Sequence, residues 1–184
     1  MKTGEIKMES RNLVITESRF DDCDQFTKWE TDPGVIRYFN VDEDRDYEEI
    51  VRDFVLNDAD PTKMQFTIIS KVDNKIIGRV QITNLNTEED SLEIYRIYIG
   101  DEENRRKGYG RETIVAVLEY AFINLHLERV SVNHFIEDDV ASSFCKALGF
   151  KPEGVARSAF KKNGKYHDMQ ILSLLRSEFF ENRR

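Results

Sequence analysis

The sequence predicts an α/β protein with a single mixed, mostly antiparallel central sheet of about seven strands flanked by helices. Seven short runs of clustered or alternating apolar residues are typical of strands, and the segments between several of them repeat apolar residues at helical spacing. The expected order is strand, helices, three strands, helix, strand, helix and two strands, with no internal repeat or long linker. We therefore expect a single domain over 1–184, with a core at about 10–176 and a charged C-terminal tail at 177–184 that frays.

The first half of the chain is expected to hold one strand, a group of helices and a hairpin. The predicted ranges are a strand at 11–18, helices at 23–30 and 46–56 with a short helical turn at 35–39 between them, and strands at 64–72 and 75–85. Pro33-Gly34 breaks the first helix. Asp73-Asn74 are residue types that tolerate the positive φ of a two-residue hairpin turn.

The run at 91–99 alternates regularly and is expected to be a central strand. Alternation divides its side chains between two faces, with Leu92, Ile94, Arg96 and Tyr98 on one and Glu93, Tyr95, Ile97 and Ile99 on the other. A long helix at 110–125 and a strand at 129–135 follow. Because a strand–helix–strand crossover is right-handed, the strands at 91–99 and 129–135 should be parallel.

The last part of the chain is expected to add a helix at 141–148 and a closing hairpin. Asp138 or Asp139 caps this helix, and Gly149 ends it in the left-handed conformation. The hairpin strands are predicted at 154–160 and 166–175. The Asn-Gly pair at 163–164 between them is a strong turn signal.

Composition and charge narrow the possible functions. The chain has 184 residues, 27 basic and 35 acidic side chains, a net charge of −8, and 40% hydrophobic residues. A protein this acidic has no global basic field for a phosphate backbone, so we expect no nucleic-acid partner and favour cationic partners. No run approaches the roughly 18 apolar residues of a membrane span, and Cys23 and Cys145 form neither a disulfide framework nor a metal-binding pair. We expect a soluble cytoplasmic protein with no membrane partner and no metal.

The segment at 105–110, RRKGYG, lies between a predicted strand and the start of a predicted helix. Gly108 and Gly110 let the backbone turn sharply and approach a ligand, and the free amides and dipole of the helix start favour an anion. The surrounding cations are Arg105, Arg106 and Lys107. The pattern favours a phosphate or pyrophosphate cradle over a tight loop with solvated arginines. It is neither a Walker motif nor a Gly-x-Gly-x-x-Gly fingerprint.

The same segment resembles the Arg/Gln-x-x-Gly-x-Gly/Ala signature of GNAT acetyltransferases, with Arg105, Gly108 and Gly110 in the signature positions. From about 10 to 176 the chain resembles the branch of ribosomal-protein alanine acetyltransferases (RimJ/RimL-like) and spermidine acetyltransferases. Further similarities are Gly78 and the runs at 147–154 and 163–168.

The resemblance implies direct transfer of an acetyl group from acetyl-CoA, as co-substrate, to an amine nitrogen. It implies that the strand bearing Asn133 splays away from the strand of Tyr98, opening a slot for the thioester. Backbone near Ile97 to Ile99 would pair with the pantetheine arm, and amides from Arg106 to Arg111 would hold the pyrophosphate. The cofactor-binding residues implied are Ile97, Tyr98, Ile99, Arg105, Arg106, Lys107, Gly108, Tyr109, Gly110, Arg111, Asn133 and Asp138. No metal is implied.

An amine must lose a proton before it attacks, so the reaction needs a base or a water chain. The resemblance makes Glu93 the first candidate, oriented by Arg96 or Tyr95, and an ordinary strand glutamate is the alternative. His134 and His167 are second choices.

The departing CoA thiolate needs a proton or a hydrogen bond, and many family members supply it from a tyrosine at the position of Cys145. The thiol of Cys145 is therefore the candidate acid. Alternatively, Cys145 is only a small buried apolar residue on a helix face. In that case Ser142 and Ser143 are possible substitutes as hydrogen-bond donors. Asp138 stands where the family commonly has an asparagine that contacts pantetheine. It can equally be a helix cap.

The acceptor is expected to be cationic. Residues 41–60 carry nine acids against two arginines, a local charge of −7, in the region that forms the acceptor wall in the family. A polyamine or the amino terminus of a basic protein is the first expectation, and an amino sugar is the second. A solvated helix face is the alternative reading of the acids.

Two other functions remain open at this stage. One is a non-catalytic acyl-CoA sensor or interaction module on the same fold, suggested by Cys145 and Asp138. The other is a nucleotide-binding domain of another kind. Apolar side chains on edge strands would permit a homodimer.

Overall fold

A computed structural model describes residues 6–37, 39, 44–181 and 183. In this part of the chain, one eight-stranded sheet has the strand order β1-β2-β3-β4-β5-β6-β8-β7. The strands are β1 (Lys7–Glu9), β2 (Leu13–Glu17), β3 (Met64–Ser70), β4 (Ile76–Asn86), β5 (Ser91–Ile99), β6 (Arg129–Phe135), β7 (Lys151–Lys162) and β8 (Lys165–Leu175). Neighbouring strands are antiparallel except for the parallel pair β5–β6.

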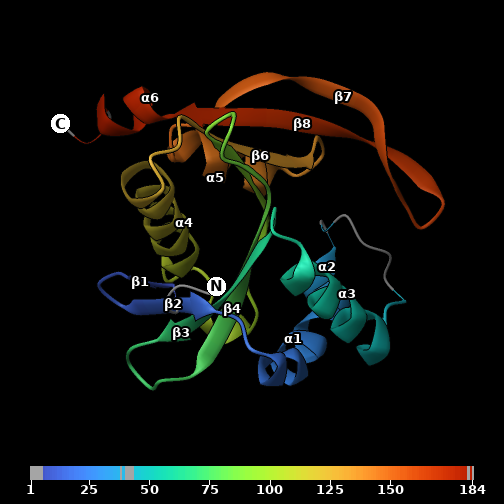
Figure 1. The fold of residues 1–184 in the computed structure, drawn as a ribbon. Coiled ribbons are helices and arrows are strands. Elements are labelled where there is room, and N and C mark those ends of the chain that lie inside the picture. The colour runs from blue at the N-terminus through green and yellow to red at the C-terminus, as the bar shows by residue number, and fades with distance from the viewer. Residues whose placement is uncertain (1–5, 38, 40–43, 182, 184) are drawn as a thin grey trace.

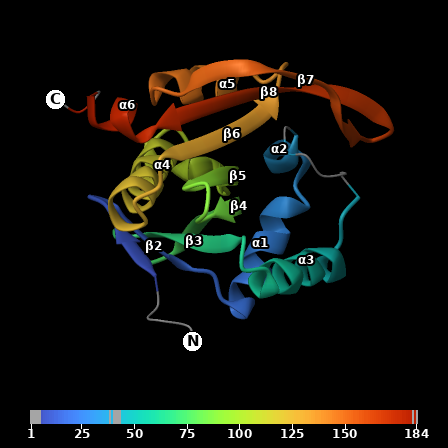
Figure 2. The same ribbon diagram turned by 45° about the horizontal axis from the view of Figure 1, so that its top comes forward.

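The predicted fold class, including the parallel crossover pair, is confirmed. The eighth strand is β1, a three-residue segment too short to show alternation in the sequence. Helices lie on both sides of the sheet: Figure 1 shows α4 on one side of β4 and α1, α2 and α3 on the other. Turning the molecule in Figure 2 brings β6, β8 and β7 forward, with α5 close to them.

The predicted helical segments are present in the expected order, and three short ones that were not predicted are added in the described part of the chain. The helical segments are η1 (Phe20–Asp22), α1 (Cys23–Glu30), α2 (Pro33–Ile36), α3 (Tyr47–Ala59), η2 (Glu102–Asn104), α4 (Tyr109–Glu119), η3 (Tyr120–Asn124), α5 (Asp139–Ala147) and α6 (Arg176–Glu181). Those that were not predicted are η1, η2 and α6. The short turn expected at 35–39 begins earlier, because Pro33 occupies the first position of α2 and the side chain of Asp32 accepts a hydrogen bond from Gly34. The long helix at 110–125 ends in one π-helical turn, η3.

The C-terminal segment is ordered further than expected. The predicted fraying is wrong for α6, because the side chain of Phe179 is buried and its ring packs 5.2 Å from that of Phe122. In the β7–β8 turn, Asn163 and Gly164 both have positive φ, 47° and 79°, as the Asn-Gly signal predicted. The β3–β4 loop runs over residues 71–75 instead of the predicted two, with Asn74 at a φ of 57°.

A bulge at Tyr95 divides β5 into two halves. Gln81 of β4 pairs with Arg96, but the next residue of β4, Ile82, pairs with Ile94, so Tyr95 has no partner of its own. The extra residue reverses the alternation. Leu92 therefore lies in the core under α4 together with Ile94, and Ile97 and Ile99 pack against this same core.

This bulge overturns the predicted division of β5 into faces. Arg96 and Tyr98 do not share a face with Leu92 and Ile94; they lie on the side of α1 and α3. Simple alternation holds only while each residue has one partner, and a bulge breaks that condition.

The two parallel strands part beyond the bulge. Pairing between β5 and β6 ends at Ile94 and Val132, although β5 continues to Ile99 and β6 to Phe135. Beyond Ile94, β5 is paired only with β4, and β6 only with β8. The splay implied by the family resemblance is therefore present.

Candidate active site

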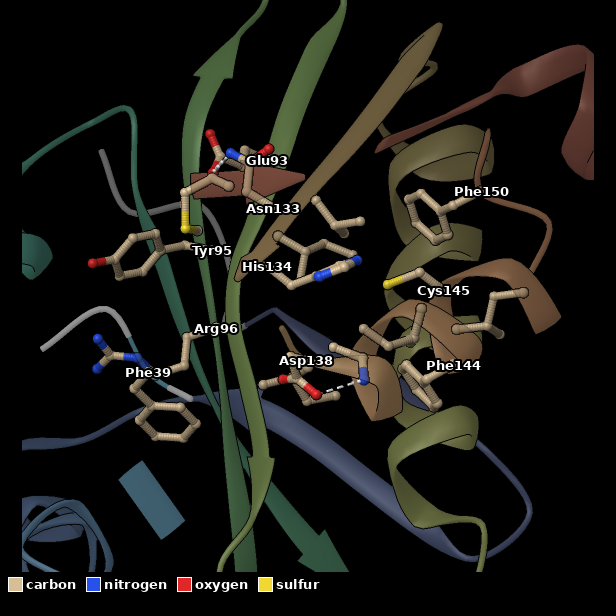
Figure 3. A pocket seen from close by; sticks show the side chains of 17 residues that line it. Phe39, Glu93, Tyr95, Arg96, Asn133, His134, Asp138, Phe144, Cys145 and Phe150 are labelled. Carbon is tan, nitrogen blue, oxygen red and sulfur yellow. Dashed lines mark hydrogen bonds between the residues drawn. The ribbon is translucent and has the colours of Figure 1, made fainter. Parts of the chain in front are cut away.

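A cavity of about 190 Å³, here called cavity 1, fills the gap where β5 and β6 part. It is enclosed by side chains from these strands and from α5, and Figure 3 shows them converging. Its polar lining consists mainly of Glu93, Tyr95, Arg96, Asn133, His134, Asp138 and Cys145.

A second cavity of about 440 Å³, cavity 2, lies between α3, the end of α1 and strands β3 to β5. Cavities 1 and 2 share three lining residues, Glu93, Tyr95 and Arg96. The bulged segment of β5 is thus the wall between them. A group held in one cavity can therefore approach a group held in the other at this segment.

Glu93 is held at this wall by two neutral amides. Its carboxylate accepts hydrogen bonds from Nδ2 of Asn84 at 2.8 Å and Nδ2 of Asn133 at 2.9 Å. Asn84 and Asn133 therefore orient Glu93 in place of Arg96 or Tyr95, the residues expected from the sequence. A carboxylate held by neutral donors has a fixed orientation and keeps lone pairs free to accept a proton.

His134 faces cavity 1 with a free nitrogen. Its Nδ1 lies 2.8 Å from the carbonyl oxygen of Phe135, an acceptor, so Nδ1 carries the hydrogen. In the described part of the chain, the buried Nε2 has no partner and is left as an acceptor. His167, the other histidine considered, lines neither cavity; its ring lies tilted against that of Phe135 with the ring centres 4.9 Å apart, and its Nδ1 lies 3.4 Å from Glu137.

Cys145 lines cavity 1 from α5, as the family position implies. Burial, together with the nearby carboxylate of Asp138, raises the pKa of its thiol to about 11. The thiol is therefore protonated at neutral pH and is a weaker acid than an exposed thiol. Ser142 and Ser143 are not among the residues that line cavity 1.

Asp138 is the N-cap of α5. Its carboxylate accepts a hydrogen bond of 2.9 Å from the amide of Ala141, which matches the cap interpretation, and it also borders cavity 1. Of the two predicted caps, Asp139 lies inside the helix. Gly149 has a φ of 93°, as expected for the residue that ends α5.

The glycine loop leaves the start of α4 open. Gly108 caps α4 with a φ of 85°, and Arg106 beside it also has a positive φ, 60°. A Cβ at Gly108 would meet nothing within 4 Å, and one at Gly110 would meet only Phe144 at 3.9 Å, so the space in front of the helix start is open. The first amides of α4 have no acceptor within the helix. This open helix start suits a pyrophosphate.

The cations of the loop serve different purposes. Arg106 and Lys107, like Arg111 on α4, are exposed and can reach an anion. Arg105 instead turns back: its Nε donates to the carbonyl oxygen of Ile99 at 3.1 Å, and its guanidinium also bonds Gly100. Arg105 therefore fastens the loop to the end of β5.

The remaining predicted cofactor residues lie at or beside the free edge of β5. Ile97 and Ile99 pair with β4 only, which leaves backbone groups on the β6 side for an extended ligand. The side chain of Tyr98 is buried on the opposite side, so only its backbone can take part. Tyr109 begins α4, so its backbone amide is one of those at the open start of the helix.

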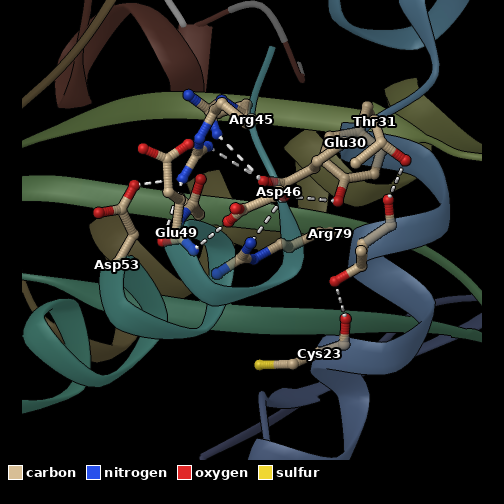
Figure 4. A network of polar contacts seen from close by, with 12 residues as sticks. Cys23, Glu30, Thr31, Arg45, Asp46, Glu49, Asp53 and Arg79 are labelled. Atoms are coloured by element: carbon tan, nitrogen blue, oxygen red, sulfur yellow. Dashed lines mark hydrogen bonds and ion pairs between the residues drawn. The ribbon is translucent and has the colours of Figure 1, made fainter. Parts of the chain in front are cut away.

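A buried charged network beside cavity 2 was not predicted. Figure 4 shows it around Glu30, which lies at the end of α1. The carboxylate of Glu30 accepts hydrogen bonds from Arg79 Nη1 at 2.7 Å and from the hydroxyl of Tyr98 at 2.8 Å. Arg45 and Arg96 lie 3.5 and 3.7 Å from its second oxygen.

Electrostatics keep Glu30 ionised in this network. Burial raises the pKa of Glu30, but the guanidinium groups of Arg79 and Arg96 outweigh it and hold the pKa below its ordinary value. A sequence signal existed: Arg79 stands within an apolar strand and Arg96 at an alternating core position. Charged residues at such positions are almost always paired.

Within the described residues, no group of three or more His, Cys, Asp or Glu side chains is arranged to hold a metal ion. No helix among them is long and apolar enough to cross a membrane.

Comparison with known proteins identifies the family. Residues 12–151 match the model of the acetyltransferase (GNAT) domain, so the chain belongs to the GNAT acetyltransferases, and its enzyme class is that of the N-acetyltransferases. The sequence is 25% identical over 176 residues to an uncharacterized N-acetyltransferase, p20, of Bacillus licheniformis, covering 92% of this chain and 96% of the relative. It is 28% identical over 112 residues to the spermidine N(1)-acetyltransferase of Vibrio cholerae, covering 61% and 64%.

Solved structures share the fold. The spermidine N-acetyltransferase of Vibrio cholerae, determined with CoA and spermine, superposes with a TM-score of 0.82 at 22% identity, over 93% of this chain and 99% of that one. A GCN5-related N-acetyltransferase of Brucella melitensis has a TM-score of 0.84 at 18% identity, over 97% and 82%.

Proposed function

We propose that this enzyme transfers an acetyl group from acetyl-CoA to a primary amine by direct attack. The observation that carries the proposal is the meeting of two cavities at the bulge of β5, with Glu93 in the wall between them. Cavity 1 continues the gap between β5 and β6, and β5 leads from there to the glycine loop at 105–110. The free strand edge and the open helix start suit the extended pantetheine arm and the pyrophosphate.

Each step of the transfer has a residue to serve it. The acceptor arrives as an ammonium, and Glu93, directly or through water, takes the proton that makes the nitrogen nucleophilic. The nitrogen then attacks the thioester carbon; as the N–C bond forms and the C–S bond breaks, the nitrogen releases its second proton and the departing thiolate gains one. The protonated thiol of Cys145 donates a hydrogen bond to the thiolate, or passes it a proton that the nitrogen's second proton then replaces.

Within residues 44–60, the described part of the acidic run, most of the acids do not line cavity 2. Asp53 is its only described member bordering cavity 2. Asp46 caps α3, and Asp60 bonds Thr62 and faces Lys63. This favours the alternative of a solvated, capping helix face. Residues 41–43 lie outside the described part, and a polyamine, a protein amino terminus or an amino sugar stays a prediction. So do a cytoplasmic location and a homodimer.

A non-catalytic acyl-CoA sensor is the second candidate. The raised pKa of Cys145, about 11, favours it, because this thiol gives up a proton less readily than an ordinary tyrosine hydroxyl, with a pKa of about 10, and is also a weaker hydrogen-bond donor. A sensor would bind acetyl-CoA without amine-dependent release of CoA.

Thermal unfolding with acetyl-CoA, desulfo-CoA, NAD or ATP tests the binding half of the proposal. Acetyl-CoA at a hundredfold its Kd stabilises by about 2.7 kcal/mol, which raises the midpoint by roughly 5 to 10 °C. Gly110→Glu puts a carboxylate into the cradle and should abolish the shift, whereas the control Gly110→Ala should keep it, since its Cβ has room. A larger shift with NAD or ATP would overturn the proposal.

A further inference from the structure

Cavity 2 contains more buried positive than buried negative charge. The side chains of Arg45, Arg79 and Arg96 that line it are 9%, 2% and 6% exposed. Among the described lining residues, Glu30 is the one comparably buried carboxylate. Asp53, which pairs with Arg45, is half exposed at the rim. Buried charge is costly unless it is paired; with Glu30 and Asp53 as their described carboxylate partners, the three guanidiniums keep an excess positive charge that leaves room for a further anion.

Arg96 is the guanidinium whose hydrogen bonds are least used. Arg79 bonds Glu30 through Nη1 and Gln65 through Nη2. Within the described ranges, Arg96 makes no side-chain hydrogen bond: its nearest anion is Glu30 at 3.7 Å, and its buried Nε has no partner. Donors of Arg96 are therefore free at a point that borders both cavities.

Aromatic rings hold Arg96 in place. Its guanidinium lies 4.9 Å from the ring centre of Phe39 and 5.2 Å from that of Tyr95. Figure 3 shows Arg96 and Phe39 together, away from Glu93 along β5. A guanidinium stacked on rings keeps its edge open for a planar carboxylate or a phosphate.

Cavity 2 is therefore lined by two chemically different groups on β5, the carboxylate of Glu93 and the guanidinium of Arg96. The two residues lie three positions apart, and three residues of strand span about 10 Å or somewhat less with a bulge. We propose, on the basis of the proposed function, that the acceptor is an amine that also carries a carboxylate or phosphate group. Its anionic group binds Arg96, with Arg45 adding positive charge, and its nitrogen lies at Glu93. A plain polyamine would instead place further cations beside three guanidiniums.

Matched amines test this directly. CoA release is measured with γ-aminobutyrate against butylamine, with O-phosphoethanolamine against ethanolamine, and with spermidine. We expect the anionic member of at least one pair to have a kcat/KM roughly tenfold to a hundredfold higher, as for one charge-assisted hydrogen bond. The pair that shows the effect distinguishes carboxylate from phosphate. Ratios of one or below in both pairs, or a preference for spermidine, would overturn the proposal.

Substitutions in cavity 2 test whether its arginines cause the preference for the anionic amine. Arg96→Gln should bring the ratio of the two kcat/KM values toward one, and Arg45→Gln should reduce it less. Arg52→Gln is the matched control, since Arg52 lies on α3 with its side chain 63% exposed and outside cavity 2. Folding of each variant is checked by its thermal shift with acetyl-CoA. If Arg96→Gln does not fold, Arg45→Gln serves as the test variant. If the ratio of the two kcat/KM values is unchanged in the variants that fold, the proposal is wrong.

Calorimetry separates this proposal from the proposed function. γ-Aminobutyrate and O-phosphoethanolamine are titrated into the protein, alone and with desulfo-CoA. If the protein does not bind acetyl-CoA, the proposed acetyl transfer is wrong. Binding of either probe to the wild type that is lost in Arg96→Gln would still support an anion site in cavity 2. An enzyme that acetylates butylamine but binds neither probe would retain the proposed function and contradict this inference.

Discussion

On the α4 side of β5, Ile94 and Ile97 belong to or pack against an apolar core, whereas on the opposite side Arg96 and Tyr98 join the charged network around Glu30. The apolar side needs only volume and shape to be filled. The charged side needs a partner for every donor and acceptor. This difference indicates which side of β5 can bind a ligand. Hydrogen-bond donors of Arg96 without a partner among the described residues lie on the charged side, which adjoins cavity 2. The bulge at Tyr95 shifts the alternation of β5 by one residue, so that beyond it Arg96 and Tyr98 lie on the charged side while Ile97 and Ile99 stay on the apolar side.

The largest expected effect comes from the wall between the cavities. Glu93→Gln keeps the shape and can still bond Asn84 or Asn133, but it removes the proton acceptor. We expect kcat/KM for any accepted amine to fall about 10²- to 10⁴-fold, the usual contribution of a general base. Steady-state CoA release gives the value, and an unchanged thermal shift with acetyl-CoA serves as the folding control. A loss of kcat/KM below about threefold would show that Glu93 is an ordinary strand glutamate and not the general base.

The next effect compares the two sides of β5 in stability. Glu30→Gln leaves three guanidiniums without their shared carboxylate and should cost about 3 to 5 kcal/mol of unfolding free energy. Leu92→Ala, on the apolar side, should cost about 2 to 5 kcal/mol through lost contacts and a cavity. Urea unfolding at neutral pH measures both. A Glu30→Gln cost below about 1 kcal/mol would show that the network is solvated.

The pH dependence of these two costs sharpens the comparison. A carboxylate whose folded-state pKa is depressed contributes stability above its unfolded-state pKa and loses it as the pH falls through the folded-state pKa. For Glu30 the ordinary value is 4.5. The difference between wild type and Glu30→Gln should therefore shrink as the pH is lowered below about 4.5, while that for Leu92→Ala stays constant. If urea unfolding shows the same pH dependence for the destabilisation of both variants, this prediction is wrong.

The smallest effect is expected at Cys145. Its thiol is a weak hydrogen-bond donor with a pKa of about 11, so Cys145→Ala should lower kcat by less than about tenfold. Pre-steady-state and steady-state CoA release distinguish a change in chemistry from one in product release. A larger loss that Cys145→Ser restores would establish a proton-donating role.

Much of the fold was readable from the sequence. β5 and β6 have their predicted bounds, and the Asn-Gly turn and Gly149 have the expected positive φ, because periodicity and turn chemistry are local properties. The faces of β5 were not readable. A bulge such as that at Tyr95 is decided by pairing with β4, which one strand's own sequence does not encode.

The candidate site was readable only in part. The glycine loop and Glu93 were named because motif and resemblance point to them. The Glu30 network was missed, because it joins α1, β4 and β5, which are far apart in the chain. Arg105 was named as a cofactor residue, yet its guanidinium is engaged by Ile99 and Gly100, a tertiary contact invisible to a motif.

Amine-dependent release of CoA is the measurement that tests the central claim most directly. Purified protein with saturating acetyl-CoA is assayed without amine, with butylamine, with γ-aminobutyrate and with spermidine. The account predicts little release without amine, a rise that saturates with amine concentration, and one acetylated amine per CoA by mass spectrometry. Binding of acetyl-CoA without amine-dependent release at any concentration would contradict it and leave a sensor on an acetyltransferase fold.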